Sequence, residues 1–272
     1  MRRLLGLLLV LPALCVIALL FIVPLASSVL GAFEVEERRG FDNFEKAFDL
    51  YSQDIVFTIL IVSLSTLLIG AFAIAIAGYL TLGENPRAVA ILRWLYRWPM
   101  FIPFIVVGQV LRTFLAKNGL MNNILIGAGI ITPLQAVSFL DWRGIVIAFV
   151  WKQTPFVTLL VAGAMASVDR DSIEAARNLG ASRLRILFEI LVPQAATPIL
   201  VGLILSFVTM MSVLSVPLMI NAQSPTMITA DIAFRINAYG DYGVANALGT
   251  ISLAITAVFA LLYLRLSMRR RA

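Results

Sequence analysis

The sequence predicts an all-α membrane protein with six transmembrane helices and a short polar helix between the fourth and the fifth. Composition is the first observation behind this prediction: 61% of the 272 residues are hydrophobic, 13% are charged, and the mean hydropathy is +0.96. Soluble domains contain roughly 45–50% apolar and about 25% charged residues. The second observation is the recurrence of apolar runs long enough to cross ~30 Å of hydrocarbon. Because no linker or internal repeat divides the chain, residues 1–272 are expected to form a single transmembrane domain.

Six stretches fit transmembrane helices, and they lie at 4–31, 55–82, 98–116, 143–166, 195–221 and 244–264. The third is bordered by charge, since Arg93 and Arg97 closely precede it. Between the spans we predict an inner loop over 83–95 and an outer hairpin over 117–142. The hairpin contains an apolar piece at 124–131 that is too short to cross the bilayer and is expected to be re-entrant or interfacial.

Arg and Lys residues in the loops determine the predicted orientation, because cytoplasmic loops of membrane proteins carry an excess of them. With the N-terminus in the cytoplasm, thirteen basic residues lie on the inner side and seven on the outer side. The outer segments also hold ten acidic residues. We therefore expect both termini, and the polar segment between spans four and five, to be cytoplasmic.

The net charge of +6 does not indicate nucleic-acid binding. The basic residues gather at membrane boundaries, where they meet lipid head groups, instead of forming a stripe with interleaved aromatic residues. The N-terminal apolar run continues to about Phe33, well beyond the roughly 7–15 residues of a secretory signal, so it is expected to remain as the first span. The single cysteine, Cys15, is expected to be a small apolar residue of that helix.

The polar segment at 167–194 contains signals for two helix starts and one helix stop. The possible caps of the first helix are Asp169, Asp171 and Ser172. Glu174 is placed in the first turn, where a carboxylate suits the positive end of the helix dipole. Gly180 provides a stop that tolerates a positive φ, and a second helix begins near Ser182. The first helix is thus one or two turns long and too polar to span a membrane.

Glu174-Ala175-Ala176 is followed at fixed spacing by Gly180, Ile190 and Pro193. This pattern resembles the cytoplasmic EAA loop of bacterial ABC-importer permeases, with Val192 where that family has Leu. In the family the loop forms a coupling helix on which an ATPase subunit docks. The resemblance implies docking residues at Ser172, Ile173, Glu174, Ala175, Ala176, Arg177, Leu179, Gly180, Ala181 and Ser182. The alternative is an ordinary amphipathic connector between two spans.

The resemblance extends over about residues 55–265, to permeases of the polyamine, sulfate, ferric-iron and thiamine importer group within the MetI-like, binding-protein-dependent family. The shared landmarks are Pro103, the outer segment 118–122, Trp151 with Pro155 and Phe156, Gly180-Ala181-Ser182, and Pro198. The most similar subgroup is the spermidine/putrescine permease subunits. The implied function is the translocation pathway of an ATP-driven importer in the bacterial inner membrane, with polyamine as the expected solute. Thiamine, ferric iron, sulfate and phosphonate are the alternative solutes.

The same resemblance implies the partners of the chain. These are two ABC ATPase subunits, a second permease that is identical or homologous, an extracytoplasmic solute-binding protein and membrane lipids. No nucleic acid, cofactor or metal is expected, and the chain is expected to be a non-catalytic subunit.

The residues themselves argue against ATP hydrolysis by this chain. It contains no His, and its three lysines, Lys46, Lys117 and Lys152, are followed by Ala, Asn and Gln. None of them completes a G-x-x-x-x-G-K-[ST] loop, so active transport needs a partner that binds ATP. The alternative is a secondary transporter or channel that works without ATP. Ion coupling would need carboxylates within the membrane, and spans two to six have no Asp or Glu in their central portions.

Lys152 is the clearest charge inside a predicted span, roughly 13 Å below the outer boundary at 1.5 Å per residue. It either lines the translocation pathway, or snorkels, or donates a hydrogen bond to backbone freed by Pro155. Met210, Met211 and Ser212 in span five are further pathway candidates, because that span lines the pathway in the family the chain resembles. Packing is the alternative role for the two methionines.

Overall fold

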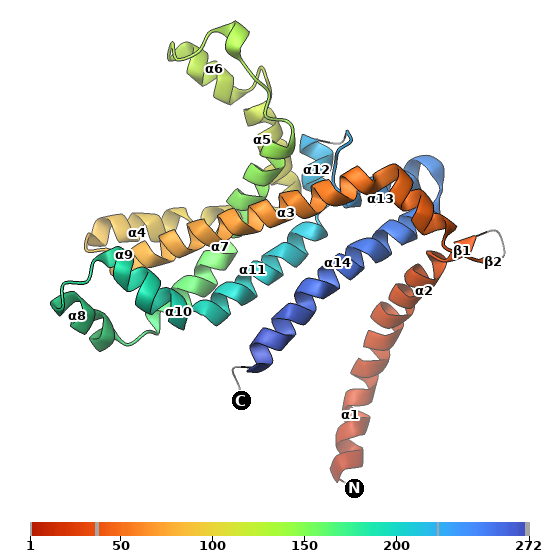
Figure 1. Ribbon diagram of the computed structural model, residues 1–272, viewed down its shortest axis with the longest axis horizontal. Coiled ribbons are helices and arrows are strands. Elements are labelled where there is room, and N and C mark those ends of the chain that lie inside the picture. The colour runs from red at the N-terminus through yellow and green to blue at the C-terminus, as the bar shows by residue number, and fades with distance from the viewer. Residues whose placement is uncertain (1, 36–37, 222, 270–272) are drawn as a thin grey trace. The chain divides into compact units, whose positions relative to one another are not determined.

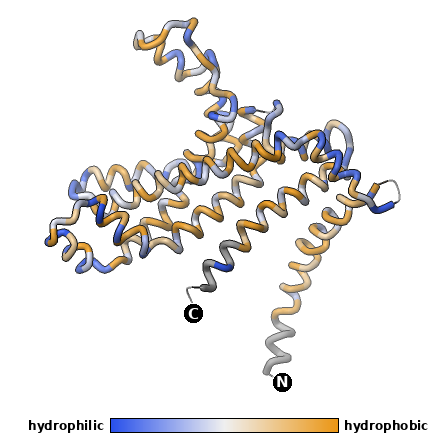
Figure 2. Tube along the Cα trace, in the orientation of Figure 1, coloured by the Kyte–Doolittle hydropathy of each residue, from blue (hydrophilic) through white to orange (hydrophobic). Residues whose placement is uncertain are grey.

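The computed structural model describes residues 2–35, 38–221 and 223–269. The described chain is almost entirely helical, with one pair of two-residue strands that the sequence did not predict (Figure 1). It divides into two compact units, one made of Met1–Ile55 with Ile228–Ile255 and the other of Val56–Met227 with Thr256–Ala272. Apolar residues follow the long helices, and polar residues concentrate where helices end (Figure 2).

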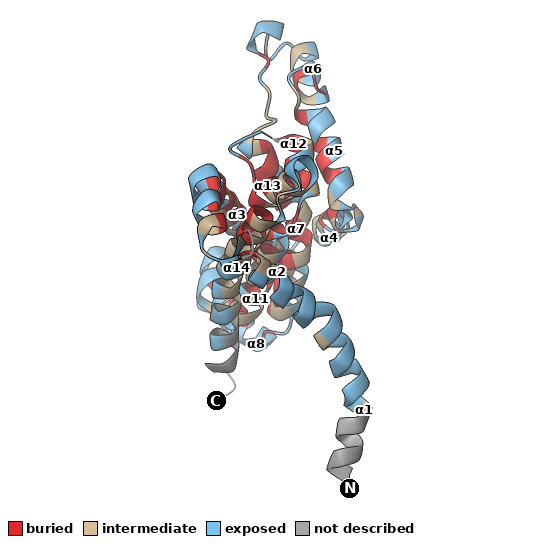
Figure 3. Cartoon of the chain, turned by 90° about the vertical axis from the view of Figure 1, so that its right-hand side faces the viewer, coloured by how far each residue is buried: buried red, intermediate tan, exposed pale blue. Residues whose placement is uncertain are grey.

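The first unit contains the N-terminal helix and the segments that follow the fifth span. Its elements are α1 (Arg2–Ile17), the π-helical η1 (Ala18–Ile22), α2 (Val23–Gly31), β1 (Glu34–Val35), β2 (Arg38–Arg39), the start of α3 (Asp42–Leu82), α13 (Ile228–Phe234), the π-helical η5 (Arg235–Tyr239) and the start of α14 (Tyr242–Arg269). The strands are antiparallel, with Glu34 opposite Arg39. From Val10 to Leu30 the side chains are mostly exposed (Figure 3), as suits a helix whose surroundings are lipid or another subunit.

The second unit contains the rest of α3 and α14 and all elements between α3 and α13. These are α4 (Pro86–Leu95), η2 (Trp98–Phe101), α5 (Phe104–Leu115), α6 (Leu120–Gly127), η3 (Pro133–Gln135), α7 (Trp142–Ala166), α8 (Arg170–Asn178), α9 (Arg183–Ile186), the π-helical η4 (Leu187–Leu191), α10 (Val192–Gln194), α11 (Ala196–Met211) and α12 (Ser215–Ile220). Helix α7 is the centre of this unit. Twelve of its residues are buried, and it packs against α5, α11 and α12.

Six predicted spans correspond to four continuous helices and two bent pairs. The continuous helices that can cross a membrane lie at Val10–Gly31, Asp42–Leu82, Trp142–Ala166 and Tyr242–Leu261. The bent pairs are Pro86–Phe101 with Phe104–Gly127, at 105°, and Arg183–Gln194 with Ala196–Met211, at 75°. If each bent pair counts as one span, the described residues contain the six that the sequence predicts.

Two predicted boundaries are wrong, and prolines explain both errors. The predicted inner loop at 83–95 is mostly helix α4, which Asn85 caps by accepting hydrogen bonds from two backbone amides. The helix then breaks at Pro103, inside the predicted third span. The predicted fifth span, 195–221, is likewise broken between α11 and α12 and follows a bend at Ala195. Pro198 cannot donate a hydrogen bond to the carbonyl of Gln194, four residues before it, so the helix bends between Gln194 and Ala196.

The outer hairpin contains helix α6, where the sequence predicts a short re-entrant or interfacial piece, and Asn122 closes it. The Asn122 side chain is buried and donates hydrogen bonds to three carbonyl oxygens, of Ala116 (3.3 Å), Lys117 (2.9 Å) and Val137 (2.9 Å). Gly119 is also required, because a Cβ there would lie 2.6–2.8 Å from three backbone carbonyl oxygens. The Asn-Gly-Leu-Met-Asn motif is therefore a structural feature of this turn.

Candidate functional site

The polar segment between α7 and α11 forms the capped helix α8 that its sequence predicts. Asp169 is the cap, and its side chain accepts a hydrogen bond from the Asp171 amide at 3.3 Å. Since α8 begins at Arg170, Glu174 lies in the second turn, which corrects the prediction that it lies in the first. The interaction of Glu174 with the helix dipole is correspondingly weak, because the effect falls off within the first turn.

Gly180 ends α8 in the left-handed conformation, as predicted, with φ of +78°. The Gly180 amide donates to the carbonyl of Arg177 at 2.9 Å, and the Ala181 amide donates to that of Ala176 at 3.0 Å. This pair of hydrogen bonds is a Schellman motif. Ser182 then caps α9 by accepting from the Arg185 amide at 3.3 Å. The two helices are thus joined by a tight turn with few free torsions.

Most of α8 is available to a partner. Ile173 is the buried residue that attaches the helix to the protein, and Ala176 is half-buried. Glu174, Ala175 and Arg177 are exposed, and Leu179, just past the helix end, is 88% exposed. A large apolar side chain that projects from a polar turn loses favourable burial unless another surface covers it.

Two surface ion pairs involve arginines of the segment that follows α8. Arg185 and Glu189 form an i, i+4 pair at 3.1 Å, and Arg183 pairs with Glu84 at 2.6 Å. All four side chains are more than half exposed, so each pair contributes little to stability.

The family can be decided by comparison with known proteins. A sequence profile for the binding-protein-dependent transport system inner membrane component matches residues 1–272. The chain belongs to this family. It is the inner-membrane permease subunit of an ABC importer and a non-catalytic component.

Individual relatives refine this assignment. The permease is 29% identical to the trehalose/maltose transport system permease protein MalF of Thermococcus litoralis, over 98% of this chain and 95% of the relative. It is 26% identical to the sulfoquinovosyl glycerol permease SmoG of Agrobacterium fabrum, over 97% and 90%. The spermidine/putrescine permease PotB of Escherichia coli, the subgroup expected from sequence, is 28% identical over 60% and 59%. The two permeases named for glycosides therefore match nearly the whole chain, and PotB matches part of it.

Solved structures show the same fold. A bacterial alginate ABC transporter, determined in complex with its alginate pentasaccharide-bound periplasmic protein, contains a chain of TM-score 0.81 and 23% identity, covering 98% of the permease and 95% of that chain. The MetNI methionine transporter gives a TM-score of 0.60 at 16% identity, over 82% and 96%. These similarities establish the architecture of the permease.

Lys152 lies at the broken third span. Its Nζ donates hydrogen bonds to the carbonyl oxygens of Pro99 at 3.0 Å and Met100 at 2.8 Å. Pro103 has no amide hydrogen to offer the Pro99 carbonyl, four residues earlier. That carbonyl accepts a hydrogen bond from the Ile102 amide at 3.3 Å, and Lys152 adds a charged donor at the break. The sequence suggested a hydrogen bond to backbone freed by Pro155; the carbonyls it reaches belong to another helix segment instead.

The other pathway candidates fall into two environments. Met210 and Met211 are buried, at 0% and 2% exposure, so the structure places both in the core of their unit. Ser212 is exposed at the C-terminal end of α11, and its hydroxyl donates to the carbonyl of Thr209 at 2.8 Å. Exposure therefore favours Ser212 over the methionines as a residue that a solute can reach.

A buried acidic pair in the first unit was not found from sequence. Asp231 of α13 is 6% exposed and Asp54 of α3 is 2% exposed. Burial, together with the charge of Asp54, raises the pKa of Asp231 to about 7, although Arg235 opposes the rise. Arg235 itself contacts the hydroxyl of Tyr51 and the carboxylate of Asp241. Because these residues are distant in sequence, only the tertiary fold brings them together.

Gly180→Val should loosen α8. Gly180 has open space where a Cβ would stand, so the cost comes from its backbone conformation, about 1–2 kcal/mol for a side-chain-bearing residue. Amide hydrogen exchange in α8 should accelerate about 5- to 30-fold. Gly180→Asn, which tolerates this conformation, and Gly249→Ala, in an open position of α14, serve as controls. Unchanged exchange in Gly180→Val would contradict the strain argument.

Lys152→Met should destabilise the permease by about 1–3 kcal/mol, because two carbonyls at the helix break lose a charged donor. Thermal unfolding in detergent measures the change, and Lys117→Met, at an exposed outer lysine, is the matched control. If Lys152→Met unfolds like the wild type but transport is lost, Lys152 acts in the pathway and not at the break.

Proposed function

We propose that the permease couples ATP hydrolysis in a partner to solute movement through helix α8, which docks in the ATPase subunit. The observation that carries this proposal is the exposed surface of α8, where small Ala175, charged Glu174 and the projecting Leu179 lie together on a rigidly capped helix. The proposed docking surface comprises Ser172, Glu174 to Arg177 and Leu179 to Ser182; Ile173, which the sequence also predicts as a docking residue, is buried against the permease and supports the helix from behind. Both termini and α8 lie on the cytoplasmic side, in agreement with the distribution of basic residues.

The complex contains two ATPase subunits, a second permease and an extracytoplasmic binding protein. Closure of the ATPases moves each α8, and the Schellman turn passes that displacement to α9 and η4 because it has few free torsions. The bent segment Arg183–Gln194 leads directly into α11, so α11 is displaced with it. Such rigid-body motion exposes the solute to the two sides in turn. Ser212, at the end of α11, is the proposed contact with the pathway, whereas Lys152 keeps the third span in shape.

The docking proposal predicts that Glu174→Ala or Ala175→Leu weakens ATPase binding roughly ten- to a hundredfold. Overpacking and a stranded polar partner each cost ~1–3 kcal/mol, and each 1.4 kcal/mol is a factor of ten. Both positions are exposed in the permease itself, so its own fold should survive. Quantitative pull-down of the ATPase measures the effect.

Two control variants make the same substitutions at exposed positions outside α8. Glu189→Ala removes a carboxylate, and Ala90→Leu enlarges an alanine of α4. Undiminished binding by Glu174→Ala and Ala175→Leu would refute docking through α8. Solute uptake by the purified permease without any ATPase would favour the ATP-independent transporter instead.

A carbohydrate is the proposed solute class. The relatives that match nearly the whole chain are named for a disaccharide and for a sulfonated glycoside. The relevant binding protein is the one that stimulates ATP hydrolysis by the reconstituted complex. We expect this protein to bind a disaccharide but not spermidine. The measurement is equilibrium binding to that protein. Tight binding of spermidine and none of sugar would restore the polyamine assignment.

A further inference from the structure

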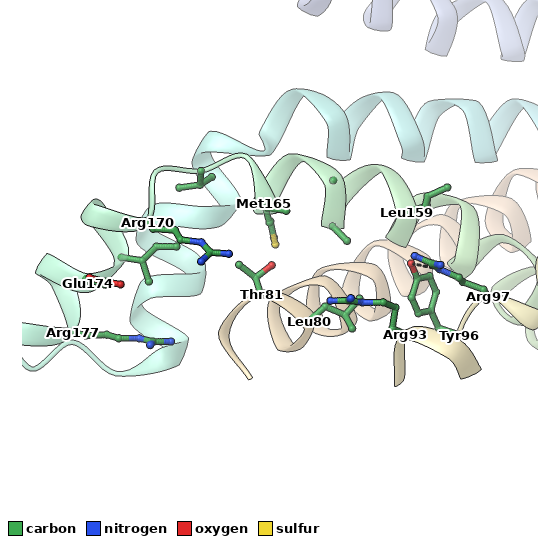
Figure 4. Close-up of a pocket in the computed structure, with 15 residues that line it drawn as sticks. Leu80, Thr81, Arg93, Tyr96, Arg97, Leu159, Met165, Arg170, Glu174 and Arg177 are labelled. Atoms are coloured by element: carbon green, nitrogen blue, oxygen red, sulfur yellow. Dashed lines mark hydrogen bonds between the residues drawn. The ribbon is translucent and has the colours of Figure 1, made fainter. Parts of the chain in front are cut away.

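A cavity of about 570 Å³ lies in the second unit between the end of α3, α4, α7 and α8. Four arginines line it: Arg93 of α4, Arg97 just after α4, and Arg170 and Arg177 of α8 (Figure 4). In Figure 4 the side chains of Arg93 and Arg170 extend toward Thr81 from opposite sides. Two segments that are distant in sequence thus direct cationic groups to one space.

The charge of this cavity is not balanced by the protein. Glu174 is the one carboxylate among the lining residues, against four arginines. Within the described part of the chain none of these four arginines forms an ion pair, whereas Arg183 and Arg185 nearby each have a carboxylate partner. The polar contact of Arg97 is with the hydroxyl of Tyr96, at 3.3 Å. Like charges gathered around one cavity repel each other, and an anion bound among them relieves that repulsion.

The wall that α7 contributes to the cavity is apolar. Leu159, Ala162, Gly163 and Ala166 of α7 line it, and their spacing of three and four residues puts them on one face of that helix. Three of them are small, which leaves room along a helix that spans the membrane. The cavity therefore joins a cationic rim to an apolar wall, and a ligand that fills both is an amphiphile with an anionic head.

We propose that this cavity binds a phosphate-bearing anion, with the arginines holding the phosphate. Arginine is suited to this task because its planar guanidinium can bind two phosphate oxygens at once. The apolar wall favours an anionic phospholipid, whose acyl chain would follow α7, over a free phosphate compound. The proposal goes beyond ATPase docking, although Arg170 and Arg177 flank Glu174 on α8 and would link a bound lipid to the position of that helix.

Native mass spectrometry and thermal unfolding of the purified full-length permease in detergent test this inference. The probes are phosphatidylglycerol, phosphatidylcholine and inorganic phosphate. We expect phosphatidylglycerol to be retained and to raise the unfolding temperature, phosphatidylcholine to do neither, and Arg93→Gln/Arg97→Gln to weaken phosphatidylglycerol retention at least tenfold. These two arginines lie outside α8, so ATPase pull-down with the same variant separates this proposal from the docking proposal.

Arg87→Gln/Arg185→Gln removes the same charge from positions outside the cavity and should retain the lipid like the wild type. Arg93→Lys/Arg97→Lys keeps the charge and should bind more tightly than the glutamine variant, which separates loss of binding from loss of fold. Stabilisation by inorganic phosphate that displaces the lipid would identify a free phosphate compound as the ligand. Equal lipid retention by the wild type and Arg93→Gln/Arg97→Gln, or no effect of either anion, would overturn the proposal.

Discussion

A backbone carbonyl that loses its helical partner inside a membrane must find another donor, because no water is available in the hydrocarbon. This requirement governs the third span of the permease. Pro103 interrupts the helix, and the carbonyls of Pro99 and Met100 at that break accept hydrogen bonds from Lys152, about fifty residues away along the chain. A charged side chain that is costly in lipid thereby becomes part of the scaffold, and the bent geometry of the span depends on it.

Hydrogen bonds also satisfy backbone carbonyls at two other breaks in the second unit. Asn122 satisfies three carbonyls of the outer hairpin, and the Schellman turn at Gly180 satisfies those at the end of α8. At the first break the Asn122 side chain donates the hydrogen bonds, and at the second the backbone amides of the turn donate them, in place of those that a continuous helix would have made. Hydrogen bonds therefore fix the geometry of these breaks, as they fix the continuous helices.

Helix α8 is predictable from sequence because its signals are local, whereas contacts between residues far apart in the sequence are not predictable in this way. The cap at Asp169, the stop at Gly180 and the second helix start at Ser182 each depend on residues within four positions of one another. Hydropathy, in contrast, detects an apolar run whether or not prolines bend it. It therefore predicts the third and fifth spans as single apolar stretches and does not predict their bends. The partners of Lys152 and the buried pair of Asp54 and Asp231 involve separate helices, and no spacing rule within one segment could reveal them.

Burial also divides residues that the sequence had grouped. Met210, Met211 and Ser212 are consecutive and looked like one candidate surface, yet two are packed in the core and the third is exposed. Position on a helix decides this, since neighbours in sequence point about 100° apart. Helix α8 shows that burial also varies within one short element. Ile173 is buried and Ala175 is exposed, whereas Arg170, Glu174 and Arg177 line a cavity beside α4 and α7. One short helix thus presents a small side chain to its surroundings and charged side chains to a cavity of the permease.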